Sequence, residues 1–210
     1  LIGTRTPVTA LWASAGRTKQ GHNSPAWLYV ATEAGRLQRI APRTGGSTWQ
    51  VLNNPLGARE PIIALAGARG GDGRMPIYAI GQSGSVLEVI GRRSRALPVT
   101  PQSAALTPHV AAVDSAGGVV IAGLLRGPDQ DETAVIIRAR RGQPSAVETL
   151  AEAAGQRFTL LHTTPDDGLL LATSGGGLRL RAGTVWREGQ VTDGPPPPRT
   201  GPDSAPARTR

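Results

Sequence analysis

The sequence predicts an all-β protein assembled from four related units, and three observations carry this prediction. Glycine and proline are abundant, with 28 and 18 of the 210 residues, and this composition suits many short strands joined by turns. No long stretch keeps the 3.6-residue period of an amphipathic helix. Short apolar segments recur instead at a nearly constant spacing, which indicates an internal repeat.

Four segments open the predicted units. They are VTALWASA from Val8, IIALAGAR from Ile62, VAAVDSAG from Val110 and FTLLHTTP from Phe158, and their successive starts lie 54, 48 and 48 residues apart. A second apolar segment, a turn, a third strand and a weaker fourth strand follow each of them. A unit of this size cannot bury both of its faces alone, so neighbouring units must stack. A repeat of ~45–50 residues with four strands per unit is typical of a β-propeller.

We therefore predict an all-β propeller of about four four-stranded antiparallel blades, either closed as a ring of four or part of a larger ring. The units span about residues 7–53, 61–101, 109–152 and 157–191, and a proline-rich tail, extended or disordered, follows over residues 193–210. The competing fold is a β-sandwich of eight or more strands, but a sandwich rarely keeps a ~48-residue period through a whole chain.

Equivalent residues support the repeat. Gly35 and Gly84 lie 49 residues apart, and Gly176 follows 92 residues later. We expect these glycines to supply a positive φ in the turn between the second and third strands. The third unit lacks this glycine, because its turn is expanded to LLRGPDQDET. Tyr29 and Tyr78 also occupy equivalent positions, which predicts that they are packing residues rather than nucleophiles.

The third strands alternate between apolar and polar residues more than the second strands do. In the first unit, this pattern predicts that Arg36, Gln38 and Arg39 face a wetter side of the blade.

The first unit ends with PRTGGSTWQVL, which resembles the Asp-box, or BNR, repeat of sialidase-like, sortilin-like and photosystem II assembly-factor-like propellers. Gly45, Gly46, Thr48 and Trp49 fit that motif, whereas Thr44 stands where the family has aspartate. The resemblance implies a propeller in which the box is a structural turn and not a catalytic site. It also implies, by analogy, an accessory subunit that helps to assemble or stabilise a larger membrane-associated complex of photosynthetic type.

Candidate catalytic and metal-binding residues are few, and we predict a non-enzymatic protein without a cofactor. His22, His109 and His162 have no partner at a metal-ligand spacing, and there is no Gly-x-Ser-x-Gly motif. His109 is expected at the start of a strand. The only weak metal candidate is the set of carboxylates in the third turn, namely Asp129, Asp131 and Glu132.

Binding regions are expected where the repeat is interrupted, because loops on a rigid scaffold carry most contacts. The longest predicted loops are Gly16–Pro25 and Arg126–Thr133, and the tail adds a third region. The candidate residues for partner binding are Arg17, Lys19, His22, Arg92, Arg93, Arg95, Arg126, Asp129, Pro195, Pro196, Pro197, Pro198 and Arg199.

The net charge of +8 comes almost entirely from arginine, which suits an acidic protein surface or an anionic lipid. The aromatic content of 3% argues against nucleic acid, because single strands stack on aromatic side chains. No apolar run approaches the ~20 residues of a membrane span. We expect an extracytoplasmic protein, periplasmic or at a membrane surface, and an anchor could precede Leu1. The alternatives are a glycan- or small-ligand-binding propeller and a degenerate glycosidase-like enzyme with paired carboxylates.

Overall fold

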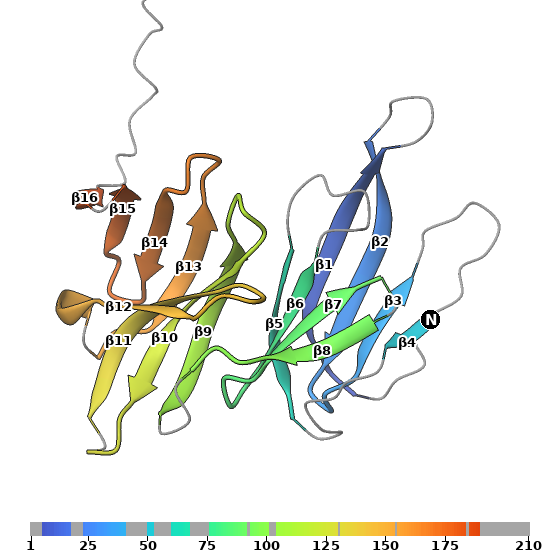
Figure 1. The fold of residues 1–210 in the computed structure, drawn as a ribbon, viewed down its shortest axis with the longest axis horizontal. Helices are drawn as coiled ribbons and strands as arrows, with labels where there is room; N and C mark the ends of the chain where they lie inside the picture. The colour runs from blue at the N-terminus through green and yellow to red at the C-terminus, as the bar shows by residue number, and fades with distance from the viewer. Residues whose placement is uncertain are drawn as a thin grey trace, which may run out of the picture.

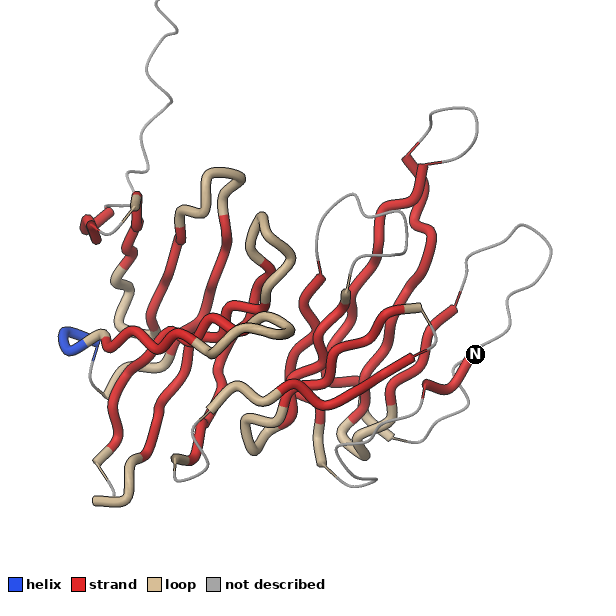
Figure 2. The backbone as a smooth tube through the Cα atoms, viewed as in Figure 1, coloured by secondary structure: helices blue, strands red, loops and turns tan. Residues whose placement is uncertain are grey.

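The computed structural model places nearly all of the described chain in β-strands (Figures 1 and 2). The described residues are 6–17, 23–40, 50–52, 60–67, 76–91, 93–100, 104–129, 131–153, 155–183 and 185–189. The single helix among them is the short 3₁₀-helix η1 (Ala151–Ala153), which follows the last strand of the third blade.

The strands form four antiparallel sheets of four strands each, which confirms the predicted all-β propeller of four blades. The first blade contains β1 (Val8–Arg17), β2 (Asn23–Thr32), β3 (Leu37–Ile40) and β4 (Gln50–Leu52). The second contains β5 (Ile62–Gly67), β6 (Ile77–Gly81), β7 (Val86–Ile90) and β8 (Arg93–Leu97). The third contains β9 (Ala105–Val113), β10 (Val119–Arg126), β11 (Glu132–Ala139) and β12 (Ala146–Thr149). The fourth contains β13 (Phe158–Thr163), β14 (Leu169–Thr173), β15 (Leu178–Ala182) and β16 (Val185–Gly189).

The blades stand in a row in the order of the sequence (Figure 1). The first strand of each blade packs beside the first strand of the next, so that β1, β5, β9 and β13 form the inner edge of the propeller. The first and fourth blades lie at opposite ends of this row (Figure 1). Each of these two blades therefore has one face that no other described blade covers.

Three apolar cores lie between successive blades, as stacking of the repeats requires. Each core contains every second side chain along the strands of one blade. These pack against the side chains of the next blade that point back toward the first. Tyr29 of β2 packs with Ala79 of β6, and Tyr78 of β6 packs with Ile121 of β10. The same relation joins the third and fourth blades through Val120 and Leu171. Both tyrosines are buried, as predicted for packing residues.

The expected turn glycines have the predicted conformation, with φ of +71° at Gly35, +86° at Gly84 and +81° at Gly176. L-residues rarely adopt this region because their Cβ crowds the following carbonyl oxygen. Gly84 meets a second constraint, since a Cβ there would lie 2.6 Å from the Leu106 carbonyl oxygen of the third blade.

Two predicted boundaries are wrong. The loop expected over Gly16–Pro25 is shorter, because Gly16 pairs with Ser24 and Arg17 pairs with Asn23 as the hairpin of β1 and β2 continues. The opening strand of the third blade begins five residues before Val110, which places His109 in the middle of β9 rather than at its start. Pro108 is tolerated in β9 because this strand pairs only with β10 and the register shifts beside it.

Candidate interaction surfaces

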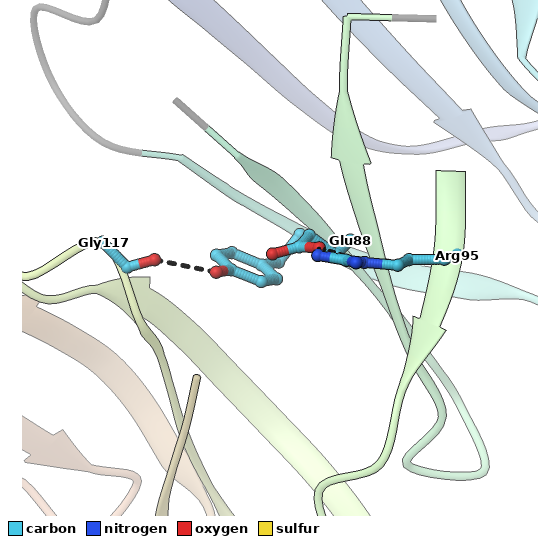
Figure 3. Close-up of polar contacts among 4 residues, drawn as sticks. Glu88, Arg95 and Gly117 are labelled. Atoms are coloured by element: carbon cyan, nitrogen blue, oxygen red, sulfur yellow. Dashed lines mark hydrogen bonds and ion pairs between the residues drawn. The ribbon is translucent and has the colours of Figure 1, made fainter. Parts of the chain in front are cut away.

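A buried polar row in the second blade binds it to the third (Figure 3). Cross-strand pairing places Tyr78 of β6, Glu88 of β7 and Arg95 of β8 side by side on one face. The Tyr78 hydroxyl donates a hydrogen bond of 2.7 Å to the carbonyl oxygen of Gly117, in the turn between β9 and β10. Burial, followed by the negative charges of Glu88 and Asp114, raises the pKa of Tyr78 to about 12. The phenol is therefore a neutral donor at physiological pH.

Arg95 belongs to this row, although the sequence suggested it as a cation for a partner. Its guanidinium pairs with the buried carboxylate of Glu88. Because a buried carboxylate needs a cation or several donors, Arg95 compensates the charge of Glu88 inside the chain. Its neighbour Arg93 is exposed at the start of β8 and remains a predicted partner-binding residue. Arg92 lies outside the described residues.

The equivalent row in the first blade also carries an arginine, and its position differs from the prediction. Arg39 is buried rather than wet, and its guanidinium stacks 4.2 Å from the centre of the Trp27 ring. It donates to Oε1 of Gln50 at 3.0 Å and to the carbonyl oxygen of Gly91 in the second blade at 2.6 Å. Stacking on an aromatic ring and donating to two acceptors offset much of the free-energy cost of removing the Arg39 guanidinium from water.

A third polar contact links the last two blades. Glu148 of β12 accepts hydrogen bonds from the guanidinium of Arg181 and, at 2.8 Å, from Nε1 of Trp186. The contacts of Trp186 place it in the interface between blades. The stretch that resembles the Asp-box includes Gly45, Gly46, Thr48 and Trp49, and residues 41–49 lie outside the described part of the chain.

The expanded turn of the third blade carries an ion pair and two exposed aspartates. Arg126 and Glu132 end the two strands of the hairpin and form an exposed ion pair. Asp129 and Asp131 are exposed at its tip. Among the described residues, no three His, Asp or Glu side chains gather into a group that could hold a metal ion. The metal site suggested for this turn stays a prediction, and in the structure Glu132 faces Arg126 across the hairpin instead of joining the two aspartates.

Several other predicted binding residues cannot be placed. Arg17 ends β1, but its side chain is not described, and the remaining ones lie outside the described residues, namely Lys19, His22, Pro195, Pro196, Pro197, Pro198 and Arg199.

The two described histidines do not converge on one site. His162 is exposed in β13. His109 accepts a hydrogen bond at Nδ1 from the backbone nitrogen of Phe158 at 3.1 Å. Burial, with a smaller effect of Arg157, lowers the pKa of His109, so its neutral form serves as this acceptor. The hydrogen bond of His109 therefore joins β9 to β13.

A surface groove of about 370 Å³ opens on the second blade, and the sequence did not suggest it. The turn between β6 and β7 forms one wall, and the end of β8 with the residues after it forms the other. Its lining residues are Ser83, Gly84, Ser85, Val86, Ala96, Leu97, Pro98, Val99 and Thr100. Hydroxyl groups, backbone and small apolar side chains line the groove, and none of these side chains is ionisable.

Glu60 holds the turn that forms the first wall of the groove. Its Oε1 accepts hydrogen bonds from the backbone nitrogen of Ser83 at 3.0 Å and from the Ser83 hydroxyl at 2.6 Å. Its Oε2 accepts from the Ser85 hydroxyl at 2.6 Å. A carboxylate that satisfies three donors of one turn fixes its conformation. The groove is thus held in place before any ligand arrives.

Comparisons with known proteins identify only a general likeness of fold. No family model matches the chain, and no curated protein matches it in sequence. Among solved structures, it resembles YCF48 bound to D1 peptide, with 15% identity and a TM-score of 0.41 over 89% of this chain and 69% of that one. It also resembles BBS1N in complex with ARL6DN, with 13% identity and a TM-score of 0.44 over 86% of this chain and 64% of that one.

A third similar structure is a putative 6-phosphogluconolactonase from Bacteroides uniformis, with 14% identity and a TM-score of 0.47. That match covers 87% of this chain and 55% of the lactonase. All three identities are too low, and all three TM-scores too small, to carry an argument about function. Within the described residues, no helix is long and apolar enough to cross a membrane.

Proposed function

We propose that this chain is a non-catalytic protein-interaction module that binds an extended segment of a partner protein in the second-blade groove. The lining of the groove is the observation that carries this proposal. Its hydroxyl and backbone groups can form hydrogen bonds with a peptide main chain, and its exposed Ala96 and Pro98 side chains can contact the peptide's apolar side chains. Without an ionisable side chain, the lining offers binding groups but no acid, base or charged nucleophile.

The rigidity of the groove supports the same proposal. Glu60 fixes one wall, and Leu97 and Val99 of the other wall are buried in the core between the second and third blades. A preformed groove loses little conformational entropy when it binds, which favours affinity for a flexible segment. The net charge of +8 would speed association with an acidic partner.

A more specific role is part of the proposal. The resemblance of the Gly45–Trp49 stretch to Asp-box propellers supports an accessory subunit that assembles or stabilises a larger, membrane-associated complex of photosynthetic type. We place the protein outside the cytoplasm, in the periplasm or at a membrane surface, where its arginines could also contact anionic lipid.

The proposal can be tested with a variant whose side chain fills the groove. Ala96 is exposed in β8 and lines the groove, so Ala96→Trp should occupy it while leaving the buried core unchanged. The matched control is Ala146→Trp, which alters an exposed alanine in β12, the corresponding strand of the third blade. Native protein and both variants would be used to capture partners from the source cells, and the bound proteins would be identified by mass spectrometry.

We expect native protein and Ala146→Trp to retain the same partner subunits and Ala96→Trp to lose them. Equal retention by both variants would show that the groove is not the binding site. If the native protein binds immobilised glycans and no protein, the glycan-binding alternative replaces this proposal. Hydrolysis of a glycoside by the native protein would instead favour the degenerate enzyme.

A further inference from the structure

Most side chains on the outward face of the fourth blade are apolar. Leu161, Leu169 and Leu171 point toward the third blade and are buried there. Because side chains alternate along a strand, the residues between them point the other way. The cross-strand pairs extend this second set through all four strands. The set includes two exposed polar residues, His162 and Arg187, which pair with Leu170 and Leu180. Six of its apolar members are Leu160, Leu170, Ala172, Leu178, Leu180 and Val185. We call these six residues the fourth-blade end face.

The equivalent face of every other blade is buried. Leu170 corresponds to Tyr29, Tyr78 and Val120 of the preceding blades, and each of those three is at most 4% exposed because the next blade covers it. Leu170 itself is only partly buried, and Leu180 and Val185 are 43% and 57% exposed. The fourth blade therefore has the surface of an internal blade, although no described blade follows it.

The first blade carries the complementary exposed face. Its Trp12 and Tyr29 point toward the second blade. On the opposite side, Leu11 and Val51 are 61% and 71% exposed, and Leu28 on the same face is partly exposed. Val30 and Gln38 lie between Leu11 and Val51 in the same cross-strand row, and Val30 is only 1% exposed. We call Leu11, Leu28, Ile40 and Val51 the first-blade end face. Terminal repeats of stacked proteins normally present polar outer faces to remain soluble, whereas apolar residues predominate on both ends of this row.

We propose that the two end faces bind each other between two copies of this chain, head to tail. The interfaces between successive blades inside the chain indicate what covers the two end faces. Within the chain, a face of the fourth-blade kind is always covered by the opposite face of the following blade, as Tyr78 is covered by the third blade. The first-blade end face is a face of that opposite kind. A second copy supplies it, whereas the same copy cannot, because its first blade lies at the far end of the row (Figure 1).

A head-to-tail contact repeats until it closes or forms a filament. Two copies related by a twofold axis would form the contact twice, and four blades from each copy would complete a ring of eight. Such closure covers both end faces of both copies and leaves no apolar end in water. This inference is independent of the proposed function, because the second-blade groove contributes no residue to either end face.

The test is the molar mass of the purified 210-residue chain in solution, measured by sedimentation equilibrium. We expect a two-chain species at micromolar concentration. Leu180→Glu should weaken it at least about tenfold, because it places a charge in an apolar contact. Val51→Lys should do the same from the other end. Both positions are exposed in the single chain, so neither change should prevent folding, which circular dichroism would verify.

Mixing the two variants distinguishes a head-to-tail contact from a face-to-face one. In a mixed pair, both substitutions fall in one interface and the other interface is native. Association should therefore be partly restored in the mixture, whereas each variant alone has two damaged interfaces. A native chain that stays monomeric would overturn the proposal. So would a dimer that survives both substitutions, or a mixture that associates no better than its separate components.

Discussion

The Tyr78 hydroxyl and the Gly117 carbonyl oxygen, 2.7 Å apart, form a hydrogen bond that joins two adjacent blades through residues 39 apart in the sequence. The contact is buried, so water cannot replace the phenol if it is removed. It joins the centre of the second blade to a turn of the third. The hydrogen bond thereby fixes one blade relative to the next in a way that apolar stacking alone does not.

Replacing Tyr78 by phenylalanine should lower the free energy of unfolding by about 1–2 kcal/mol, because the Gly117 carbonyl loses its partner. Urea denaturation followed by tryptophan fluorescence would measure the change. Tyr29→Phe is the matched control, since Tyr29 is the equivalent buried residue of the first blade and its hydroxyl has no hydrogen-bond partner among the described residues. Equal losses in the two variants would contradict the assigned role of the bond.

The same phenol predicts a decline of stability in alkali. Its pKa is raised from 10.0 to about 12 in the folded chain, so the unfolded chain loses this proton first as the pH rises. Because the unfolded state then binds fewer protons, the free energy of unfolding falls with increasing pH. The contribution is complete below about pH 10 and is lost by about pH 12. Denaturation series across this range should show a flatter profile for Tyr78→Phe than for the native chain.

The repeat could be predicted because it depends on local pattern. Gly35, Gly84 and Gly176 mark the same turn in three blades, and each has the positive φ that was expected. Tyr29 and Tyr78 were assigned to the core from their equivalent positions alone. The hairpin at Gly16–Pro25 was missed because small and polar residues pair their backbones as well as apolar ones do, and no side-chain pattern indicates it.

The contacts between blades could not be predicted from periodicity, which gives the face of a side chain but not the atom opposite it. Arg39 illustrates this, because its acceptor on Gly91 belongs to another blade. Glu60 likewise meets Ser83 across 23 residues. The pairing of Glu88 with Arg95 was open to prediction, since the two residues lie on adjacent strands joined by a short turn, where opposite charges attract across the sheet.

Glu148 should stabilise the junction of the third and fourth blades more than an exposed ion pair would. It serves both Arg181 and Trp186 in a partly buried setting. A double-mutant cycle with Glu148→Ala and Arg181→Ala should give a coupling of about 1.5–3 kcal/mol, the range for hydrogen bonds to charged groups. The same cycle on the exposed pair of Arg126 and Glu132 should give less than about 1 kcal/mol. Similar couplings for the two pairs would contradict this assignment.

Two turn glycines with the same backbone conformation should respond differently to alanine. Gly176 has φ of +81° and no atom within 4 Å of an added Cβ, so Gly176→Ala should cost only the strain of the left-handed backbone, about 1–2 kcal/mol. At Gly84 the added methyl group would also lie 2.6 Å from the Leu106 carbonyl oxygen and 2.7 Å from the Leu106 Cβ. Relieving this overlap must shift the third blade, so Gly84→Ala should cost about 1–3 kcal/mol more. Chemical denaturation of both variants would decide, and equal costs would mean that the second and third blades do not approach as closely at this turn as the structure shows.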